Sequence, residues 1–412
     1  MAVIKPFKAV RPGRKYADRV IALPYDVMDR EEAAEMAEGN PYSFLHISRS
    51  EIDLPDAFEH TKEVYDKAKS NLEEFIADGI LVRDEEEMVY VYREIMDERV
   101  QTGIFACASV DDYLENRIRK HELTRIEKED DRTNHFDICD ADTEPVYLTH
   151  REDKKLRRII ESWADNHMPE YNVTDRNGVR HLLWPVDDSD VVKEVVRRYR
   201  EIPVMYIADG HHRSASSVRV AQKRREENPD YTGTEEFNYV LAAIFPENDL
   251  HVFDYNRVVK DLANLRTDEF IKAVKKAGFT VDEAGDKPYR PEKKGVFGMY
   301  LDDKWYRIEA SKDIVPDDVI KSLDVAVLQD NILGPILGIE DPRTSDRIDF
   351  IGGIRGLTEL ERRVHKDMKV AFSVYPVTVT ELMDVADAGK TMPPKSTWFE
   401  PKLASGLVIH TL

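Results

Sequence analysis

The chain has 412 residues, of which 42% are hydrophobic and 34% charged, a balance that suits a soluble globular protein with a substantial core. Its formal net charge of −21 argues against binding to nucleic acid or to an anionic membrane, because phosphate groups would be repelled. No run of about 18 apolar residues is present, so the sequence predicts no membrane span.

The two cysteines, Cys107 and Cys139, form no CxxC pair. Their number argues against a disulfide framework or a thiolate zinc site and favours a reducing compartment. Charged residues interrupt the start of the chain and no apolar segment follows, so we expect no secretory signal. The expected location is the cytoplasm.

Short β-type runs alternate with amphipathic helical stretches, which predicts an α/β or α+β fold with mixed sheets and flanking helices. In chain order, the expected strands are residues 20–23, 88–96, 99–110, 203–208 and 238–245. The expected helices are residues 56–78, 120–132, 153–167, 188–200 and one that starts near residue 211. Residues 88–96 and 99–110 are expected to pair with each other.

Residues 258–312 differ in character from the rest of the chain. They contain an expected helix at 267–279 and an expected hairpin at 295–310, which turns at Asp302-Asp303. We therefore predict a core domain at 1–257, a small α+β subdomain at 258–320 and a C-terminal segment, 321–412, that packs back on the core.

The stretch YIADGHHRSASS at 206–217 joins an expected strand to an expected helix. The first N–H groups of a helix have no backbone partners, and together with the helix dipole they attract anions. Gly210 allows a phosphate to approach the backbone closely, and the planar guanidinium of Arg213 can bind phosphate oxygens. The sequence therefore predicts a phosphate-binding turn here.

The neighbours of Gly210 add further candidate groups. His211 and His212 can donate hydrogen bonds or transfer a proton, and Ser214 offers a hydroxyl. Asp209 can hold Mg²⁺ or instead cap the helix with its carboxylate. Two alternatives remain: the histidines cap the helix while Arg213 pairs with a surface acid, or both histidines bind zinc without the usual companion motif.

A second candidate region is KHELTRIEKEDDR at 120–132. On a helix, four of its charged residues fall within an arc of roughly 80°, and two more extend the arc to about 120°. In order, these are Glu122, Arg125, Glu129 and Arg132, then His121 and Lys128. The face is either a solvated surface laced with ion pairs or a site in which arginines bind phosphate and Glu122 acts as general base.

The segment Met392-Pro393-Pro394-Lys395-Ser396-Thr397 cannot form a regular helix, because consecutive prolines force an extended backbone. It presents Lys395, Ser396 and Thr397 from a rigid loop, and such a cation suits contact with phosphate. The alternative is a packed tail with Trp398 and Phe399 in the core.

The sequence resembles two known groups of proteins. The turn Gly210-His211-His212-Arg213 resembles the G-x-x-R phosphate turn of the ParB/sulfiredoxin-like superfamily, and its DGHHR form looks like the free-serine-kinase branch. Nearly the whole chain resembles the family of unknown function numbered ten-fifteen (DUF1015). The matching blocks are PYDV at 25–28, NPYSFLH at 40–46, KHELTRIEKEDDR at 120–132, YIADGHHR at 206–213, YNRVV at 255–259 and MPPKSTWFEPKLASGL at 392–407.

The resemblance implies a ParB/sulfiredoxin-like core and a phosphotransferase that moves phosphate between ADP or ATP and serine or phosphoserine, with Mg²⁺. It implies catalytic roles for Glu122, His211 and His212. Phosphate binding would fall to Asp209, Gly210, Arg213, Ser214, Lys395, Ser396 and Thr397, and substrate binding to His121, Thr124, Arg125, Lys128, Glu129 and Arg132. The alternatives are a phosphoserine-type phosphatase that uses water and a non-enzymatic ParB-like nucleotide switch.

Overall fold

The computed structural model of the protein describes residues 1–412, which fold into two compact units. Unit 1 contains residues 1–250 together with residues 401–412, and unit 2 contains residues 251–400. Along the chain, unit 2 is therefore an insertion into unit 1. None of the helices in either unit is long and apolar enough to cross a lipid bilayer.

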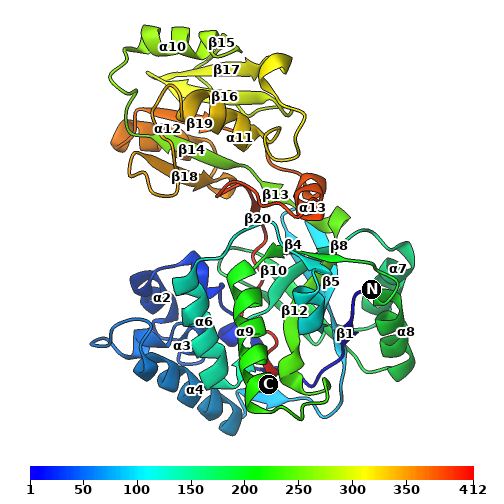
Figure 1. The fold of residues 1–412 in the computed structure, drawn as a ribbon. Coiled ribbons are helices and arrows are strands. Elements are labelled where there is room, and N and C mark those ends of the chain that lie inside the picture. The colour runs from blue at the N-terminus through cyan, green and yellow to red at the C-terminus, as the bar shows by residue number, and fades with distance from the viewer. The chain divides into compact units, whose positions relative to one another are not determined.

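A mixed nine-stranded sheet forms the centre of unit 1 (Figure 1). Its strands follow the order β6-β11-β8-β12-β5-β4-β10-β9, and β1 pairs separately with β5. Only β6 with β11 and β8 with β12 run parallel. The bounds are β1 Ile4–Lys5, β4 Val89–Met96, β5 Arg99–Ser109, β6 Ile118–Arg119, β8 Val146–His150, β9 Tyr171–Thr174, β10 Arg180–Val186, β11 Met205–Asp209 and β12 Tyr239–Pro246.

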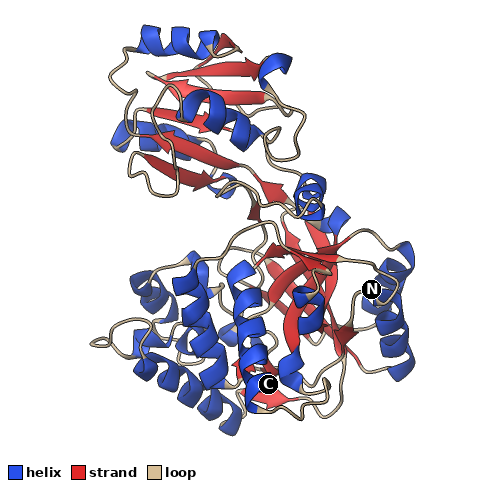
Figure 2. Ribbon diagram, viewed as in Figure 1, coloured by secondary structure: helices blue, strands red, loops and turns tan.

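Helices lie on both sides of this sheet, with α7 and α8 on one side and α6 and α9 on the other (Figure 2). Apolar side chains of α7, α8 and the sheet form the main core, which includes Ile104, Leu156 and Val195. The helices are α1 Ala17–Val20, α2 Arg30–Ala37, α3 Leu45–Ser48, α4 Lys62–Ala77, α5 Val110–Leu114, α6 Ile126–Cys139, α7 Lys154–Asn166, α8 Ser189–Tyr199 and α9 His211–Glu227.

The C-terminal residues are built into unit 1 through two small pairings. Strand β21 (His410–Thr411) pairs with β7 (Ala141–Asp142), and Ser405 forms a β-bridge with Ala22. Another small sheet joins β2 (Val10–Pro12) to β3 (Leu81–Arg83). These pairings bring residues 401–412 next to segments from the first half of the chain.

Unit 2 is built on a six-stranded sheet in the order β15-β17-β16-β19-β14-β18. Its strands are β14 Tyr255–Val259, β15 Phe279–Gly285, β16 Val296–Leu301, β17 Lys304–Ala310, β18 Ile348–Gly352 and β19 Val370–Ser373. Its helices are α10 Thr267–Lys276, α11 Asp324–Leu328, α12 Thr358–Lys366 and α13 Val379–Asp387. A separate pair, β13 (Val252–Phe253) with β20 (Trp398–Phe399), joins the beginning and the end of the unit.

The mixed α/β class expected from the sequence is confirmed, as are several elements. Strands β4 and β5 pair antiparallel around a tight turn at residues 97–98. Helices α7 and α8 begin after Asp153 and Asp188, whose carboxylates accept hydrogen bonds from N–H groups of the first turn. The hairpin at 295–310 turns at Asp302 and Asp303, which both have positive φ, as a two-residue hairpin turn of this kind requires.

Three expected elements differ from the structure. Residues 20–23 are not a strand, because α1 ends at Val20 and only Ala22 makes a β-bridge. The helix expected at 56–78 begins at Lys62. The helix expected at 120–132 is wrong in its first half: residues 120–125 continue from β6 without helical structure, and α6 runs from Ile126 to Cys139.

The subdomain boundary predicted at residue 320 also differs from the boundaries of the two units in the structure. Strands β18 and β19 lie after residue 320, yet they pair with β14 and β16 of the same sheet. The segment 321–400 therefore belongs to unit 2, and only residues 401–412 return to unit 1.

Gly103 of β5 provides a test of the central sheet. A Cβ at this position would lie 2.7 Å from the ring of Phe245 and still closer to the carbonyl oxygen of Ile244. We expect Gly103→Ala to lower the free energy of unfolding by about 3 kcal/mol, the upper range for overpacking a core. Chemical denaturation followed by circular dichroism measures this change.

The control is Val100→Ala on the same strand, where the side chain is 51% exposed. A surface change of this kind shifts stability by about 0.5 kcal/mol or less. Equal stability of the Gly103→Ala variant and the wild type would contradict the packing described for β5 and β12.

Candidate functional site

The turn between β11 and α9 has the geometry of an anion-binding helix start. Gly210 adopts φ +87°, a left-handed conformation that favours glycine, and α9 begins at His211. No side chain caps the first turn of α9 and no acidic residue lies in it. The N–H groups of that turn are thus left for a ligand or water.

Asp209 lies immediately before this turn and is held by two contacts. Its Oδ1 accepts a hydrogen bond from the Gly210 N–H at 2.8 Å, and its Oδ2 lies 3.1 Å from the Nζ of Lys402. Burial raises the pKa of Asp209, but the charges of Lys402 and Arg213 outweigh burial and hold that pKa below its usual range. Asp209 is therefore a carboxylate already paired with a lysine.

Arg213 lies inside the protein and not at the surface of the turn. Its side chain is only 3% exposed, and its Nη1 donates to the carbonyl oxygen of Pro145 at 2.6 Å. Its guanidinium packs against Gly210, since a Cβ at Gly210 would lie 3.1 Å from the Arg213 Nε. The Nε itself is buried without a hydrogen-bond partner.

A buried charge cluster surrounds this arginine. Glu144 is buried, its Oε1 accepts hydrogen bonds from the Ser405 hydroxyl at 2.8 Å and the Tyr25 N–H at 3.2 Å, and its Oε2 has no partner. The guanidinium of Arg132 lies 4.1 Å from the centre of the Tyr25 ring. Burial raises the pKa of Glu144, although the charges of Arg213 and Arg132 oppose this shift.

The same cluster extends toward α4. Asp131 accepts hydrogen bonds from Arg132 Nε at 2.7 Å and from the Tyr65 hydroxyl at 2.9 Å, and its Oδ1 also lies 2.7 Å from His60 Nδ1. Arg132 is thus paired to its neighbouring carboxylate and buried. It supplies positive charge to the interior and does not extend from an exposed helix face.

His121, Glu122 and His211 come together beside the turn. The rings of His121 and His211 are both buried and meet edge to face, with centroids 4.5 Å apart. Glu122 is 49% exposed, and its Oε2 lies 3.8 Å from Nδ1 of His211. Burial lowers the pKa of His121 to about 4 and lowers that of His211 well below its usual range, so both rings are neutral near pH 7.

The remaining residues predicted on α9 and around 120–132 make local contacts. His212 accepts a hydrogen bond at Nε2 from the Arg125 N–H at 3.0 Å, and the Ser214 hydroxyl donates to the Gly210 carbonyl at 3.0 Å. Glu129 lies 3.5 Å from Arg219 of α9, one of several ion pairs between α6 and α9. Thr124 is half-buried and Lys128 is exposed.

The residues predicted as one site at 120–132 fall into two groups in the structure, one beside the start of α9 and one in the interface between α6 and α9. His121, Glu122 and Arg125 adjoin the start of α9, in an extended segment. Glu129 faces α9 as part of an ion-paired helix interface, which is the alternative that the charge pattern left open.

Lys395, Ser396 and Thr397 belong to unit 2. The Lys395 carbonyl accepts a hydrogen bond from Nη2 of buried Arg257 at 3.1 Å, and the Ser396 hydroxyl donates to the Pro393 carbonyl at 2.6 Å. The ammonium of Lys395 lies 5.4 Å from the centre of the Tyr255 ring. Burial lowers the pKa of Arg257 to about 10. This loop carries its own cluster of cations within unit 2.

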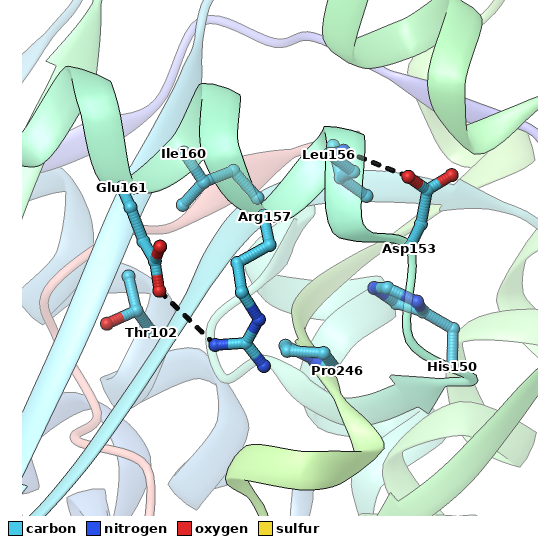
Figure 3. A pocket seen from close by; sticks show the side chains of 8 residues that line it. All are labelled: Thr102, His150, Asp153, Leu156, Arg157, Ile160, Glu161 and Pro246. Atoms are coloured by element: carbon cyan, nitrogen blue, oxygen red, sulfur yellow. Dashed lines mark hydrogen bonds and ion pairs between the residues drawn. The ribbon is translucent and has the colours of Figure 1, made fainter.

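A small pocket elsewhere in unit 1 is lined by residues of β8, α7 and the end of β12 (Figure 3). Its polar side chains are those of Thr102, His150, Asp153, Arg157 and Glu161. Arg157 also forms ion pairs with Glu152 and Asp249. Its volume of about 10 Å³ holds roughly one water molecule. It is too small for a nucleotide or an amino acid.

Sequence reasoning did not select several residues of the α9 turn and the charge cluster, among them Tyr25, Glu144, Lys402 and Ser405. Tyr25 lies in PYDV, and Lys402 and Ser405 lie in MPPKSTWFEPKLASGL, so two of the family-matching blocks already contained them. Glu144 lies in no such block, and its neighbours are remote in sequence. Only the fold brings these positions to the same place.

Residues 4–326 match the family described as "Protein of unknown function (DUF1015)", and the chain belongs to this family. A search of curated proteins finds no match. Among solved structures, a mutant free serine kinase in complex with AMP has 14% identity and a TM-score of 0.36, covering 74% of this chain and 92% of that chain.

Two further solved structures are similar at the same level. A conserved hypothetical protein from Pyrococcus furiosus has 14% identity and a TM-score of 0.35, covering 77% of this chain and 98% of that one. SbnI with a C-terminal truncation, from Staphylococcus aureus, has 10% identity and a TM-score of 0.38. The match covers 74% of this chain and 87% of that chain. Such TM-scores are too low to assign an activity.

The buried position of Arg213 predicts a large effect on stability. We expect Arg213→Met to lower the free energy of unfolding by about 3 kcal/mol, because Glu144 would lose a buried counter-charge. Thermal and chemical denaturation of the full chain measure this loss.

Lys223→Met on the same helix is the matched control, since Lys223 pairs with Asp137 at the surface. Exposed pairs contribute about 0.2–1 kcal/mol, so this variant should remain close to the wild type. If the two variants were equally stable, the internal role of Arg213 would be refuted.

Proposed function

We propose that unit 1 binds a nucleotide phosphate at the start of α9 and transfers phosphate between ADP or ATP and a small hydroxy-amino acid, serine or phosphoserine. The observation that carries this proposal is the uncapped, acid-free first turn of α9 behind Gly210. Backbone N–H groups and the helix dipole stabilise a phosphate at such a turn, and no acidic side chain within the first turn of α9 competes for these N–H groups.

The surrounding charges support this assignment. Lys402 is held beside the turn by Asp209, where its ammonium can shift toward a phosphate oxygen. Arg213 and Arg132 add positive charge from the interior, in which screening by water is weak. Arg213 therefore contributes as a fixed charge behind the turn, in place of the direct phosphate fork expected from the sequence.

The amino-acid substrate would occupy the side of the turn formed by residues 121–125. Glu122 is half exposed and close to His211, so it can take the proton from a serine hydroxyl or contact the substrate ammonium. In the direction from phosphoserine, an oxygen of the ADP β-phosphate attacks the phosphorus. The bond from phosphorus to the serine oxygen breaks, and that oxygen receives a proton from the protonated carboxyl group of Glu122, the reverse of the proton removal above.

Mg²⁺ would accompany the nucleotide, since lysines and arginines only partly neutralise its phosphates. Asp209 is a poor sole ligand, because both of its oxygens already have partners and Lys402 would have to move away. We propose that phosphate oxygens and water supply most of the coordination. A cytoplasmic location would provide both nucleotides.

Phosphoserine hydrolysis is the second candidate function. The exposure of Glu122 favours it, because water can reach the group that would activate a nucleophile. In that reaction water replaces the ADP oxygen, and the turn at α9 binds the phosphate of the substrate alone.

The decisive assay incubates the full chain with phosphoserine and Mg²⁺, with and without ADP. We expect ATP and serine to form only when ADP is present, because ADP is the phosphate acceptor in the proposed reaction. A coupled luminescence assay follows ATP, and a colorimetric assay follows free phosphate. Free phosphate without ADP would support the phosphatase, whereas neither product in either direction would refute phosphate transfer.

Gly210→Ala tests the turn itself. The new Cβ would be strained at φ +87° and would press on the Arg213 guanidinium, displacing the first N–H groups of α9. We expect ADP affinity, measured by calorimetry, to fall about tenfold or more, equivalent to the loss of one charge-assisted hydrogen bond.

Gly178→Ala is the matched control for this change. Gly178 has φ +82° in the turn between β9 and β10, and a Cβ there meets nothing within 4 Å. Both variants carry the same kind of backbone strain, but only Gly210 adjoins α9. Equal ADP affinity in the two variants would place the nucleotide elsewhere.

A further inference from the structure

The ends of two parallel strands bring two histidines together in unit 1. Strand β6 pairs with β11 in parallel register, Ile118 with Met205 and Arg119 with Tyr206. His121 follows the end of β6 by two residues, and His211 follows the end of β11 by two residues. In the register of this pairing His121 is level with Ala208, and β11 continues to Asp209 before α9 begins. Both histidines therefore lie beyond the carboxyl ends of the two strands, where ligands commonly bind in α/β proteins, and their rings are in contact.

Both histidines are buried, yet their nitrogens have few partners. His121 and His211 are 2% and 5% exposed. The His121 ring interacts with the backbone of Ile207, but neither of its nitrogens is in good hydrogen-bond geometry, and Nε2 of His211 has no hydrogen-bond partner. Buried polar atoms are almost always satisfied, so several unpaired nitrogens around one point indicate a missing partner.

Glu122 completes a set of three donors. One ligand atom from each of His121, Glu122 and His211 lies within 4.8 Å of the other two. Ligand atoms around a tetrahedral Zn²⁺ are about 3.3 Å apart, given metal–nitrogen bonds of about 2.0–2.1 Å. Small side-chain rotations would therefore close the set around an ion, and the exposed carboxylate of Glu122 can move most easily.

The electrostatic setting is compatible with a cation. Metal ligation needs neutral imidazole, and both rings lie in the interior, where the charged form is disfavoured. The negative charge of Asp209 acts on both rings, while Lys120 and His212 act against it at His211. Glu122 supplies the carboxylate that would offset part of the charge of a divalent ion.

We propose that His121, Glu122 and His211 bind a divalent first-row transition metal ion such as Zn²⁺. Two imidazoles and one carboxylate favour such an ion over Mg²⁺, which prefers oxygen ligands. Three protein ligands leave coordination positions open for water or a substrate oxygen, as in catalytic metal sites.

This inference goes beyond the proposed phosphate transfer. If the ion is bound, Glu122 and His211 are its ligands, and an oxygen bound to the ion would be easier to deprotonate than a free hydroxyl. Metal binding is measured without nucleotide or phosphoserine, so it is tested separately from that activity. Zn²⁺ binding without phosphate transfer would support the metal site and reject the proposed function. Phosphate transfer without Zn²⁺ binding would support the proposed function and reject the metal site.

The test titrates the EDTA-treated and desalted full chain with Zn²⁺, and separately with Mg²⁺, by calorimetry. We expect one equivalent of Zn²⁺ to bind far more tightly than Mg²⁺ and to raise the thermal unfolding temperature, because the ion binds only the folded arrangement. Co²⁺ should give visible absorption bands of a four- or five-coordinate ion.

Glu122→Gln and His211→Gln should each weaken Zn²⁺ binding about tenfold or more and abolish the Co²⁺ bands. Glu122 is at the surface, so its variant should fold normally, as circular dichroism can verify. His365→Gln changes an exposed histidine of unit 2, which lies outside the set, and should leave Zn²⁺ affinity unchanged. Absence of stoichiometric Zn²⁺ binding, or equal affinity in all three variants, would overturn the proposal and leave His121 and His211 as a packed aromatic pair.

Discussion

The parallel pairing of β6 with β11 is the constraint on which the candidate site of unit 1 depends. It sets the segment 120–125 beside the turn at Gly210, and the Arg125 N–H then bonds to His212 across the two segments. Without this pairing, the start of α9 would still attract an anion, but His121 and Glu122 would not adjoin it. A two-residue strand thus determines which side chains share the site.

The sequence predicted correctly those elements that are determined by residues close to one another in the chain. Asp153 and Asp188 mark helix starts because their carboxylates satisfy N–H groups two or three residues away. The strand, the glycine turn and the helix at 205–227 were predicted from a short apolar run followed by Gly210. The helix at 120–132 failed because burial of His121 beside His211 fixes residues 120–125 in a non-helical path, and helical periodicity cannot anticipate that contact.

The positions of the charged residues depend on contacts between distant segments, so the sequence predicted them poorly. Arg213 was predicted to bind phosphate and Arg132 to bind the substrate, since a sequence does not reveal how deeply an arginine is buried. The structure shows both in the interior with Glu144, a residue that no local motif marks. Burying charges is costly unless they are paired, so this cluster ties distant segments of unit 1 together. The pairing of Lys402 with Asp209, nearly two hundred positions earlier in the chain, could be found only through the fold.

The insertion of unit 2 has a consequence for biosynthesis. The paired strands β13 and β20 hold together the points where the chain enters and leaves unit 2, so a complete domain is made between Leu250 and Pro401. Lys402 and Ser405 emerge from the ribosome only after that whole domain has been translated. Until then, Asp209 lacks its lysine and Glu144 lacks its serine hydroxyl. The interior of unit 1 therefore lacks these C-terminal residues throughout the synthesis of unit 2. During that period the incomplete interior of the nascent chain is accessible to chaperones.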